Sequence, residues 1–355
     1  MPLWRWLALL GSLPVSALFS AQALPVIGTD PNILSYPALL PERSQSATPL
    51  LVSNSPETVR SPGLLYRDAV TGAARVLAYH LNALPGDQPA RLLIGARNPS
   101  ALPLSLTLTR RGAALSRGPD PLIGQETLLR FFASGPQAER TLEPGEALTL
   151  YDSGPLRPGQ VVSVLLDLVA SGEVQLSVYL LRGPERPGPD TRALDADGLH
   201  QRGTFPGAER TWRLRLPPAP LHTPFRVVFS DQADLPLTGT DALTGRPQVL
   251  KGNFGVLYDL TLEGTAGTLL AASARGGAYR GALTLQDGTR RTPLLIGRGQ
   301  ALIDGAFPEP LWRVRSDTLR VGFVPANGSN LPLALVLYPP GFPQPPVGPT
   351  PTPGR

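Results

Sequence analysis

The sequence predicts an all-β protein in which two antiparallel, sandwich-like units follow one another. Three observations favour this fold class. Glycine supplies 37 and proline 42 of the 355 residues, and both residue types divide a chain into short elements. Apolar or alternating runs recur between these turns at intervals of about 8 to 12 residues, as they do in β-sandwiches. A turn-rich segment then separates two series of such runs.

The first series of expected strands lies between residues 50 and 183. Its clearest member is LPLSLTLTRRG, in which Leu104, Leu106 and Leu108 alternate with serine and threonine, so that one face is apolar and the other polar. We expect a β-sandwich domain built from seven runs, all interpreted as strands: RVLAYHLN, ARLLIGARN, LPLSLTLTRRG, QETLLRFFAS, EALTLYD, QVVSVLLDLVAS and EVQLSVYLLRG.

The second series occupies residues 203–339, after a stretch at 184–202 whose proline, glycine and charged residues indicate a linker. In RTWRLRL the apolar residues alternate with Arg213 and Arg215, which are therefore expected to face water on a half-buried strand. Asp287 is followed by a glycine, and this Asp-Gly dipeptide predicts a tight hairpin. The expected strands are RTWRLRLP, FRVVFSD, FGVLYDLTLEG, GTLLAASA, AYRGALTLQDG, TPLLIGRG, DTLRVGFVPA and LPLALVLYPP.

The N-terminus has the pattern of an export signal. One arginine precedes a mostly apolar stretch, and Ala21-Gln22-Ala23 offers a small-residue cleavage site, so residues 1–23 are interpreted as a signal peptide. Residues 24–49 are an expected extended lead-in, and residues 340–355 form a proline-rich tail. No later segment is apolar enough to span a bilayer. We expect an exported protein of the periplasm, cell envelope or cell surface, with no membrane span in the mature chain.

Composition limits the chemistry that the chain can perform. It has no cysteine, which excludes disulfides and thiolate sites. The formal net charge is +5, and Lys251 is the single lysine, so the basic charge is almost all arginine. Those arginines are scattered, whereas nucleic-acid readers show a basic stripe or cluster. Acidic polymers are therefore possible partners through counterion release, and nucleic acid is a less favoured alternative.

The stretch LDADGLHQRGTF holds the most suggestive group of polar residues. Asp195 and Asp197 precede a glycine, as in a calcium loop, but the glutamate required at position twelve is replaced by Pro206. Solvated turn carboxylates are favoured over a structural calcium ion, which stays a weak alternative with Asp195, Asp197 and His200 as its candidate ligands. We interpret Asp197, His200 and Arg202 as an interdomain joint fixed by hydrogen bonds.

Catalytic patterns are not found. His80, His200 and His222 are far apart in sequence, whereas a catalytic metal site normally uses two or three histidines together. His80 is expected to be a hydrogen-bonded histidine of a sheet, and His222 a loop residue. No G-x-S-x-G elbow places a serine beside a base, and Glu143 and Glu146 belong to a turn. We expect no catalytic residues and no enzymatic activity. A metal-dependent enzyme centred on His200 is the least favoured alternative.

Eight motifs, taken in order, resemble a family of secreted bacterial envelope proteins of unassigned activity. They are VSNSPETV, GLLYRD, ARVLAYHLN, LTRRG, IGQETLLRFF, DGLHQRGTF, KGNFGVLYDL and ARGGAYRGA, spread from about residue 50 to 285. Members often carry a copper amine oxidase-like N-terminal module, which this chain lacks, so the resemblance implies export and envelope association and no oxidase activity. Similar proteins are accessory subunits of S-layer complexes. The sequence therefore predicts a non-enzymatic structural or accessory envelope protein that binds other envelope or S-layer proteins; the alternative is a polyanion or nucleic-acid binder with an arginine-rich surface.

Overall fold

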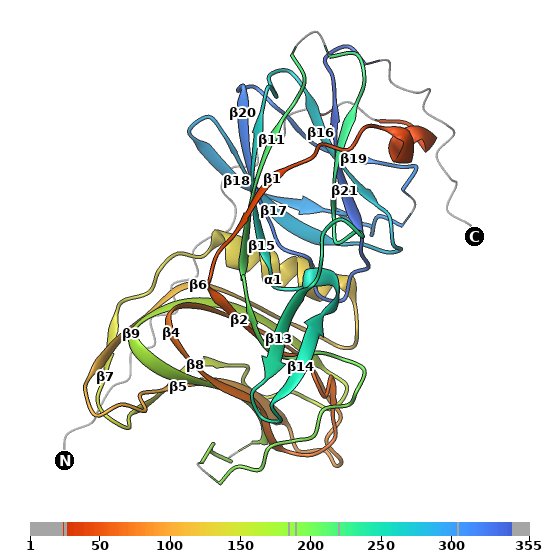
Figure 1. Ribbon diagram of the computed structural model, residues 1–355. Coiled ribbons are helices and arrows are strands. Elements are labelled where there is room, and N and C mark those ends of the chain that lie inside the picture. The colour runs from red at the N-terminus through yellow and green to blue at the C-terminus, as the bar shows by residue number, and fades with distance from the viewer. Residues whose placement is uncertain are drawn as a thin grey trace, which may run out of the picture.

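The computed structural model describes residue 24 and residues 27–183, 185–188, 190–218, 221–303 and 305–342. The expected signal peptide at 1–23 and residues 343–355 of the expected tail lie outside the described residues. Strands dominate the described part, which confirms the all-β prediction, and one α-helix accompanies them. Figure 1 shows a lower body of long, bent strands, an upper body of shorter strands, and the helix between them.

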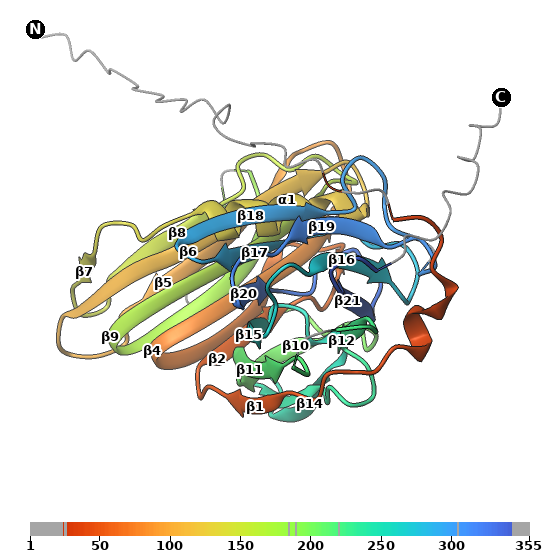
Figure 2. The ribbon, with the colours of Figure 1, turned by 90° about the horizontal axis from the view of Figure 1, so that it is seen from above.

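Two long strands form the spine of the lower body. β4 (Gly63–Asn82) and β9 (Val161–Arg182) pair antiparallel along nearly their whole lengths, with register shifts near Tyr66 and Gly72. They run side by side in Figure 2. β5 (Ala90–Arg97) and β8 (Ala147–Asp152) continue the sheet from the second half of β9, whereas β6 (Leu104–Ser116) and β7 (Arg140–Leu142) continue it from the first half.

The sheet therefore bends over itself into two layers. The Leu104, Leu106 and Leu108 side chains of β6 share one hydrophobic cluster with Leu92 and Ile94 of β5. These residues lie on opposite layers and face each other across a common core, as the alternating pattern of LPLSLTLTRRG predicts. The first unit is thus a β-sandwich, closed on one side by the bend of β4 and β9 and open on the other, between β6 and β8.

The run QETLLRFFAS is a helix, so its interpretation as a strand is wrong. Helix α1 (Pro121–Ala133) begins after Asp120, whose carboxylate accepts a hydrogen bond from the Leu122 N–H at 2.8 Å. Pro121 occupies the first turn, where its missing N–H costs nothing. The buried residues recur at helical spacing, with Leu128 and Phe131 one turn apart on the face that packs on β6 and β9. Aspartate followed by proline was the signal for this helix.

The upper body contains two further sheets. A six-stranded sheet has the order β1 (Glu42–Gln45), β11 (Glu209–Arg215), β15 (Leu257–Glu263), β20 (Thr318–Phe323), β17 (Gly281–Asp287) and β18 (Arg290–Ile296). A four-stranded sheet has the order β12 (Phe225–Phe229), β21 (Leu333–Tyr338), β16 (Leu269–Ala274) and β19 (Glu309–Arg313). Their pairs are antiparallel except for β11 with β15, which is parallel. The hairpin expected at Asp287 is present between β17 and β18.

Strands cross the expected boundary at residues 184–202 in both directions. β10 (Arg202–Pro206), β13 (Leu237–Asp241) and β14 (Arg246–Leu250) come after it, yet they extend the sheet of the lower body through β2 (Pro49–Ser53). β2 and β3 (Thr58–Val59) in turn pair parallel with β4. Conversely, β1 belongs to the expected lead-in, which also holds a 3-10 helix (Pro31–Ser35), and it pairs with β11 in the upper body. The domain ranges therefore stay a prediction. In the structure, each body includes strands from both sides of the expected boundary.

A continuous hydrophobic core joins the two bodies. Leu77 and Leu165, on the outer face of the sandwich, share one buried cluster with Phe131 of α1 and with Trp212 and Phe323 of the upper body. Helix α1 packs against β6 and β9 on one side and against β17 and β18 on the other. The helix therefore fills the space between the bodies and buries apolar side chains of both (Figure 1).

Replacement of Gly112 by alanine tests how closely α1 packs on β6. An added Cβ would lie 2.0 Å from the Thr127 carbonyl oxygen and 2.6 Å from the Phe131 nitrogen, and both are helix backbone atoms that cannot rotate away. We expect Gly112→Ala to lower the free energy of unfolding by about 2 kcal/mol or more, as overpacking does. The matched control is Gly118→Ala, where the added Cβ meets nothing within 4 Å. Equal denaturant midpoints for the two variants would contradict this packing.

Candidate functional site

The side chain of Asp197 is the centre of the predicted joint. Its Oδ1 accepts hydrogen bonds from Ser55 Oγ at 2.9 Å, from the Leu199 N–H at 3.0 Å and from the His200 N–H at 2.9 Å. Its Oδ2 accepts from the Glu57 N–H at 3.0 Å and contacts His200 Nδ1 at 2.8 Å. Burial alone would raise the pKa of this carboxyl group, but the hydrogen bonds outweigh it and hold the pKa well below its usual range. Asp197 therefore ties the 197–200 turn to the segment that follows β2.

The other predicted joint residues have separate partners. His200 Nε2 lies 3.2 Å from the carboxylate of Glu57, whose pKa is raised chiefly by burial. Arg202 is buried, and its hydrogen-bond and ion-pair partners do not include His200; its guanidinium donates to Asp241 at 2.9 Å and to the Leu194 carbonyl at 2.7 Å. Asp195 is exposed. The structure thus brings Asp197 and His200 together, whereas Arg202 forms its ion pair with Asp241 at the end of β13.

A cavity of about 430 Å³ adjoins the joint, with Asp195, His200, Arg202 and Asp241 in its lining. Within the described ranges, no group of three or more histidine, aspartate or glutamate side chains is placed to hold a metal ion. The carboxylate of Asp197 is already surrounded by N–H and O–H donors, whereas a calcium ion requires converging oxygen ligands. This geometry gives no support to a calcium ion at Asp195, Asp197 and His200.

A serine–histidine pair lies nearby but has no access to solvent. His80 Nε2 is 2.9 Å from Ser53 Oγ, and His80 Nδ1 is 2.9 Å from the Pro56 carbonyl oxygen. The carbonyl can only accept, so Nδ1 carries the proton and Nε2 accepts from the serine. Burial lowers the pKa of His80 to about 4, and the side chain is completely buried. A substrate cannot reach this pair, and its role is to fasten β2 to β4.

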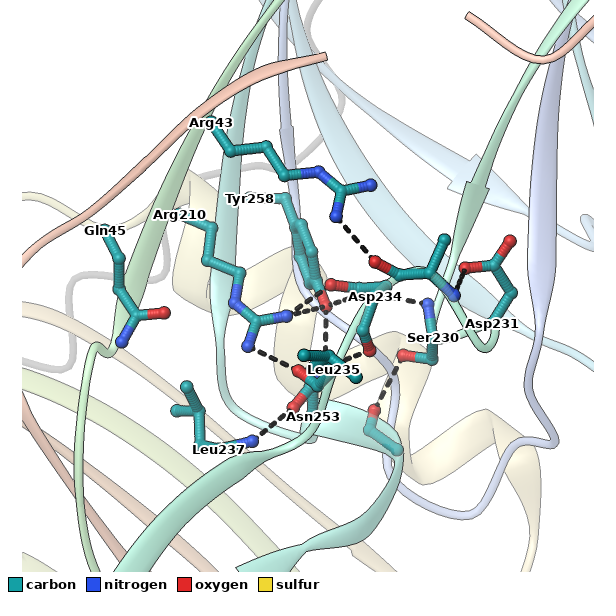
Figure 3. Close-up of polar contacts among 12 residues, drawn as sticks. Arg43, Gln45, Arg210, Ser230, Asp231, Asp234, Leu235, Leu237, Asn253 and Tyr258 are labelled. Atoms are coloured by element: carbon teal, nitrogen blue, oxygen red, sulfur yellow. Dashed lines mark hydrogen bonds and ion pairs between the residues drawn. The ribbon is translucent and has the colours of Figure 1, made fainter. Parts of the chain in front are cut away.

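A second buried polar cluster had no signal in the sequence. Figure 3 shows Asp234 at its centre, in an ion pair with Arg210 and accepting a hydrogen bond from the Tyr258 hydroxyl at 2.5 Å. Burial and the neighbouring carboxylate raise the pKa of Tyr258, so the hydroxyl stays protonated and donates. Ser230 and Asn253, the latter in a short 3-10 helix (Lys251–Asn253), have φ angles of 57° and 50° in the left-handed region. The network holds the 230–237 loop in this strained shape.

The 230–237 loop also forms a contact with β1, which belongs to the expected lead-in. Arg43 of β1 donates to the Ala233 carbonyl at 2.5 Å (Figure 3). Its guanidinium also lies 5.0 Å from the centre of the Trp212 ring. The donors and acceptors of this cluster are directed at one another, so they stabilise the loop and the β1–β11 pair. The alternation of RTWRLRL correctly places Arg213 and Arg215 outside, but Arg210 is buried because an acidic partner 24 positions away neutralises it.

Two further cavities lie at the open side of the sandwich. One cavity of about 650 Å³ and another of about 290 Å³ lie between β6 and β8, and both are lined by Thr149 and Leu150 of β8. Arg111, Arg130 and Arg140 also line them. We call the two cavities together the β8 groove. Sequence reasoning missed it, because its arginines come from three elements, β6, α1 and β7.

Comparisons with known proteins place the chain in no family. No protein-family model matches the sequence, and no curated protein matches it. Among solved structures, the PBSX exported protein XepA is similar over 78% of this chain and 86% of its own, at 12% identity and a TM-score of 0.17. Dimeric latent PorU from Porphyromonas gingivalis is similar over 87% of this chain and 22% of its own, at 9% identity and a TM-score of 0.16. TM-scores this low establish no shared fold. No helix in the described residues combines the length and apolar character needed to cross a membrane.

Acidification tests the buried state of His80. An unfolded chain protonates this histidine below pH about 6.5, whereas the folded protein does so only near pH 4. The neutral, buried His80 therefore makes its full contribution to the free energy of unfolding above pH about 6.5, and this contribution decreases as the pH falls toward 4. We expect the free energy of unfolding to drop by about 2 kcal/mol between pH 7 and pH 5.

Urea unfolding at the two pH values measures this drop. His80→Gln should remove most of the pH dependence in this window, and the control variant His222→Gln, which changes an exposed loop residue, should keep it. An unchanged slope in His80→Gln would assign the pH dependence to other groups.

Proposed function

We propose that the chain is an exported, non-enzymatic protein of the cell envelope, a structural or accessory subunit of an S-layer or another outer-envelope assembly. Export is supported by the signal-like pattern at residues 1–23. The observation that carries the binding role is the β8 groove, an arginine-lined opening along an unpaired sheet edge. Sheet edges bind extended segments of other proteins through backbone hydrogen bonds.

The polar clusters favour binding over catalysis. The Ser53–His80 pair is fully buried, and the carboxylate of Asp234 is engaged by Arg210 and Tyr258. A catalytic group has to meet its substrate, and these groups meet only each other. The joint cavity beside His200 is the place where a metal-dependent enzyme would have its site; metal analysis of protein purified without chelators tests that alternative, and we expect no stoichiometric metal.

A polyanion binder is the second candidate, because Arg111, Arg130 and Arg140 gather at one opening. Simple charge attraction predicts binding to nucleic acid or acidic polymers with a steep loss of affinity as salt increases. A shape-dependent protein partner predicts binding that survives physiological salt. A salt series with single-stranded DNA therefore separates the two candidates, and we expect no binding to DNA at physiological salt.

Native envelope extraction tests the proposed function. We expect the chain, released from envelopes of the producing cell with mild detergent, to migrate on native gels and in size exclusion as part of a large complex with other envelope proteins. An unrelated exported protein of similar size serves as the control for trapping in detergent micelles. Recovery of the chain as a free monomer of about its sequence mass, 37.7 kDa with the signal retained, would contradict the assembly role.

A further inference from the structure

We propose that the outer edge of β8 receives an extended acidic segment of a partner protein, which adds to the sandwich as one more strand. This inference rests on the proposed function and specifies the chemistry of the partner.

β8 ends the order of strands in its sheet, with β5 as its neighbour on one side and no described strand on the other. Across the groove, the corresponding edge of β6 is already occupied. The Gln137 N–H donates to the Leu108 carbonyl at 2.9 Å, the Arg111 N–H donates to Ser134 Oγ at 2.8 Å, and Arg130 donates to the Ala113 carbonyl. The segment after α1 therefore covers β6, and the unpaired backbone at this opening belongs to β8.

The other outer strands are protected by means that proteins commonly use against edge pairing. β14, β18 and β19 contain Pro247, Pro293 and Pro310, each of which lacks an N–H group. Arg226 of β12 exchanges backbone hydrogen bonds with the segment at 37–39. β1, β3 and β7 have only four, two and three residues. β8 has six residues, with the sequence ALTLYD, and neither proline nor a covering segment.

The charge along the β8 groove is complementary to an acidic occupant. Arg111 and Arg140 form no ion pair with any described carboxylate, and Arg130 has only a partly exposed contact with a glutamate of its own helix at 3.6 Å. The single acidic residue in the lining is Asp152, and Arg91 of β5 already neutralises it, with its Nε 3.2 Å from the carboxylate. The opening therefore presents unneutralised positive charge.

The apolar side chains of the groove indicate the pattern of the occupant. Leu106, Leu108 and Leu150 are buried at its base, whereas Leu115 is 42% exposed at its rim. In an added strand, alternate side chains would face this apolar base and the others would face outward, toward the arginines. The occupant is thus an extended segment in which aspartate or glutamate alternates with apolar residues.

The C-terminal tail of this chain does not fit. Residues 340–355 contain no acidic residue, and proline recurs throughout them. Such a segment offers few N–H groups for pairing and no charge to match the arginines. The occupant is therefore expected to come from a different protein.

Peptide binding to the full mature chain tests the proposal. The probe is a fluorescent, capped octapeptide in which glutamate alternates with valine and threonine, and its affinity is measured by anisotropy at physiological salt. We expect saturable binding by the wild-type chain. The variant Arg111→Glu/Arg140→Glu should bind about tenfold more weakly or worse, because both charges are reversed. The matched control is Arg213→Glu/Arg313→Glu, which reverses two exposed charges far from β8 in the chain and should bind like wild type.

A second peptide separates strand addition from charge alone. N-methylation of alternate residues keeps every charge but removes the N–H groups that a strand needs, so we expect it to weaken binding by about tenfold or more. Hydrogen exchange should slow at residues 147–152 when the unmodified peptide binds. Equal affinity for both peptides, equal binding of single-stranded DNA, protection confined to other strands, or no binding at all would each overturn the proposal. So would self-association of the wild-type chain that the double arginine variant abolishes, because a second copy would then be the occupant.

Failure here is distinguishable from failure of the proposed function. If the chain migrates with an envelope complex but the peptide does not bind, the envelope role stands and the β8 edge is not its contact. If the peptide binds but the chain is recovered as a free monomer, the edge is a binding site and the assembly role is contradicted.

Discussion

The guanidinium group of Arg75 is the contact on which the joining of the two bodies depends. It lies on β4, completely buried, and binds Asp167 of β9 through Nε at 2.6 Å and through Nη2 at 2.9 Å. Its remaining Nη1 donates to the Ala208 carbonyl at 2.7 Å and to the Gly255 carbonyl at 3.3 Å, both in the upper body. Asp167 neutralises the charge within the lower body, and without the two carbonyls a buried Nη1 donor would lack an acceptor at a cost of about 1–3 kcal/mol, so this contact stabilises the joined arrangement of the two bodies. The strand pairing across the expected boundary and the shared core around α1 act together with this contact.

In the joined structure, the groups that are free to bind another molecule lie at the surface. Three buried groups of ionic side chains are directed at one another: the Arg75–Asp167 pair, the Arg202–Asp241 pair and the Asp234 network. One side of the sandwich is closed by the bend of β4 and β9, and α1 and the upper body cover its outer face. The open side between β6 and β8 is what remains for a partner. A molecule built in this way is suited to hold another chain by shape and charge, and for this reason we propose a role in assembly.

The sequence predicted those features that depend on neighbours in the chain. Alternation located the Leu104–Leu108 face, and the turn composition located Asp197 and His200, which are three residues apart and do contact each other. The sequence did not predict contacts between residues that are far apart in the chain. The interpretation of QETLLRFFAS as a strand rests on its apolar content and overlooks Asp120, which caps the N-terminus of the helix. Pairing of β1 with β11, and the hydrogen bond of Ser55 to Asp197 across 142 positions, have no local signal, because they depend on how the sheets meet.

The most direct test of this account is a crystal structure of the chain with its envelope partner, or with the segment of that partner that binds. The account predicts an extended partner backbone hydrogen-bonded along the outer edge of β8, with its acidic side chains near Arg111 and Arg140. A partner bound at the cavity beside His200, or on the upper body with the β8 edge left open, would contradict it.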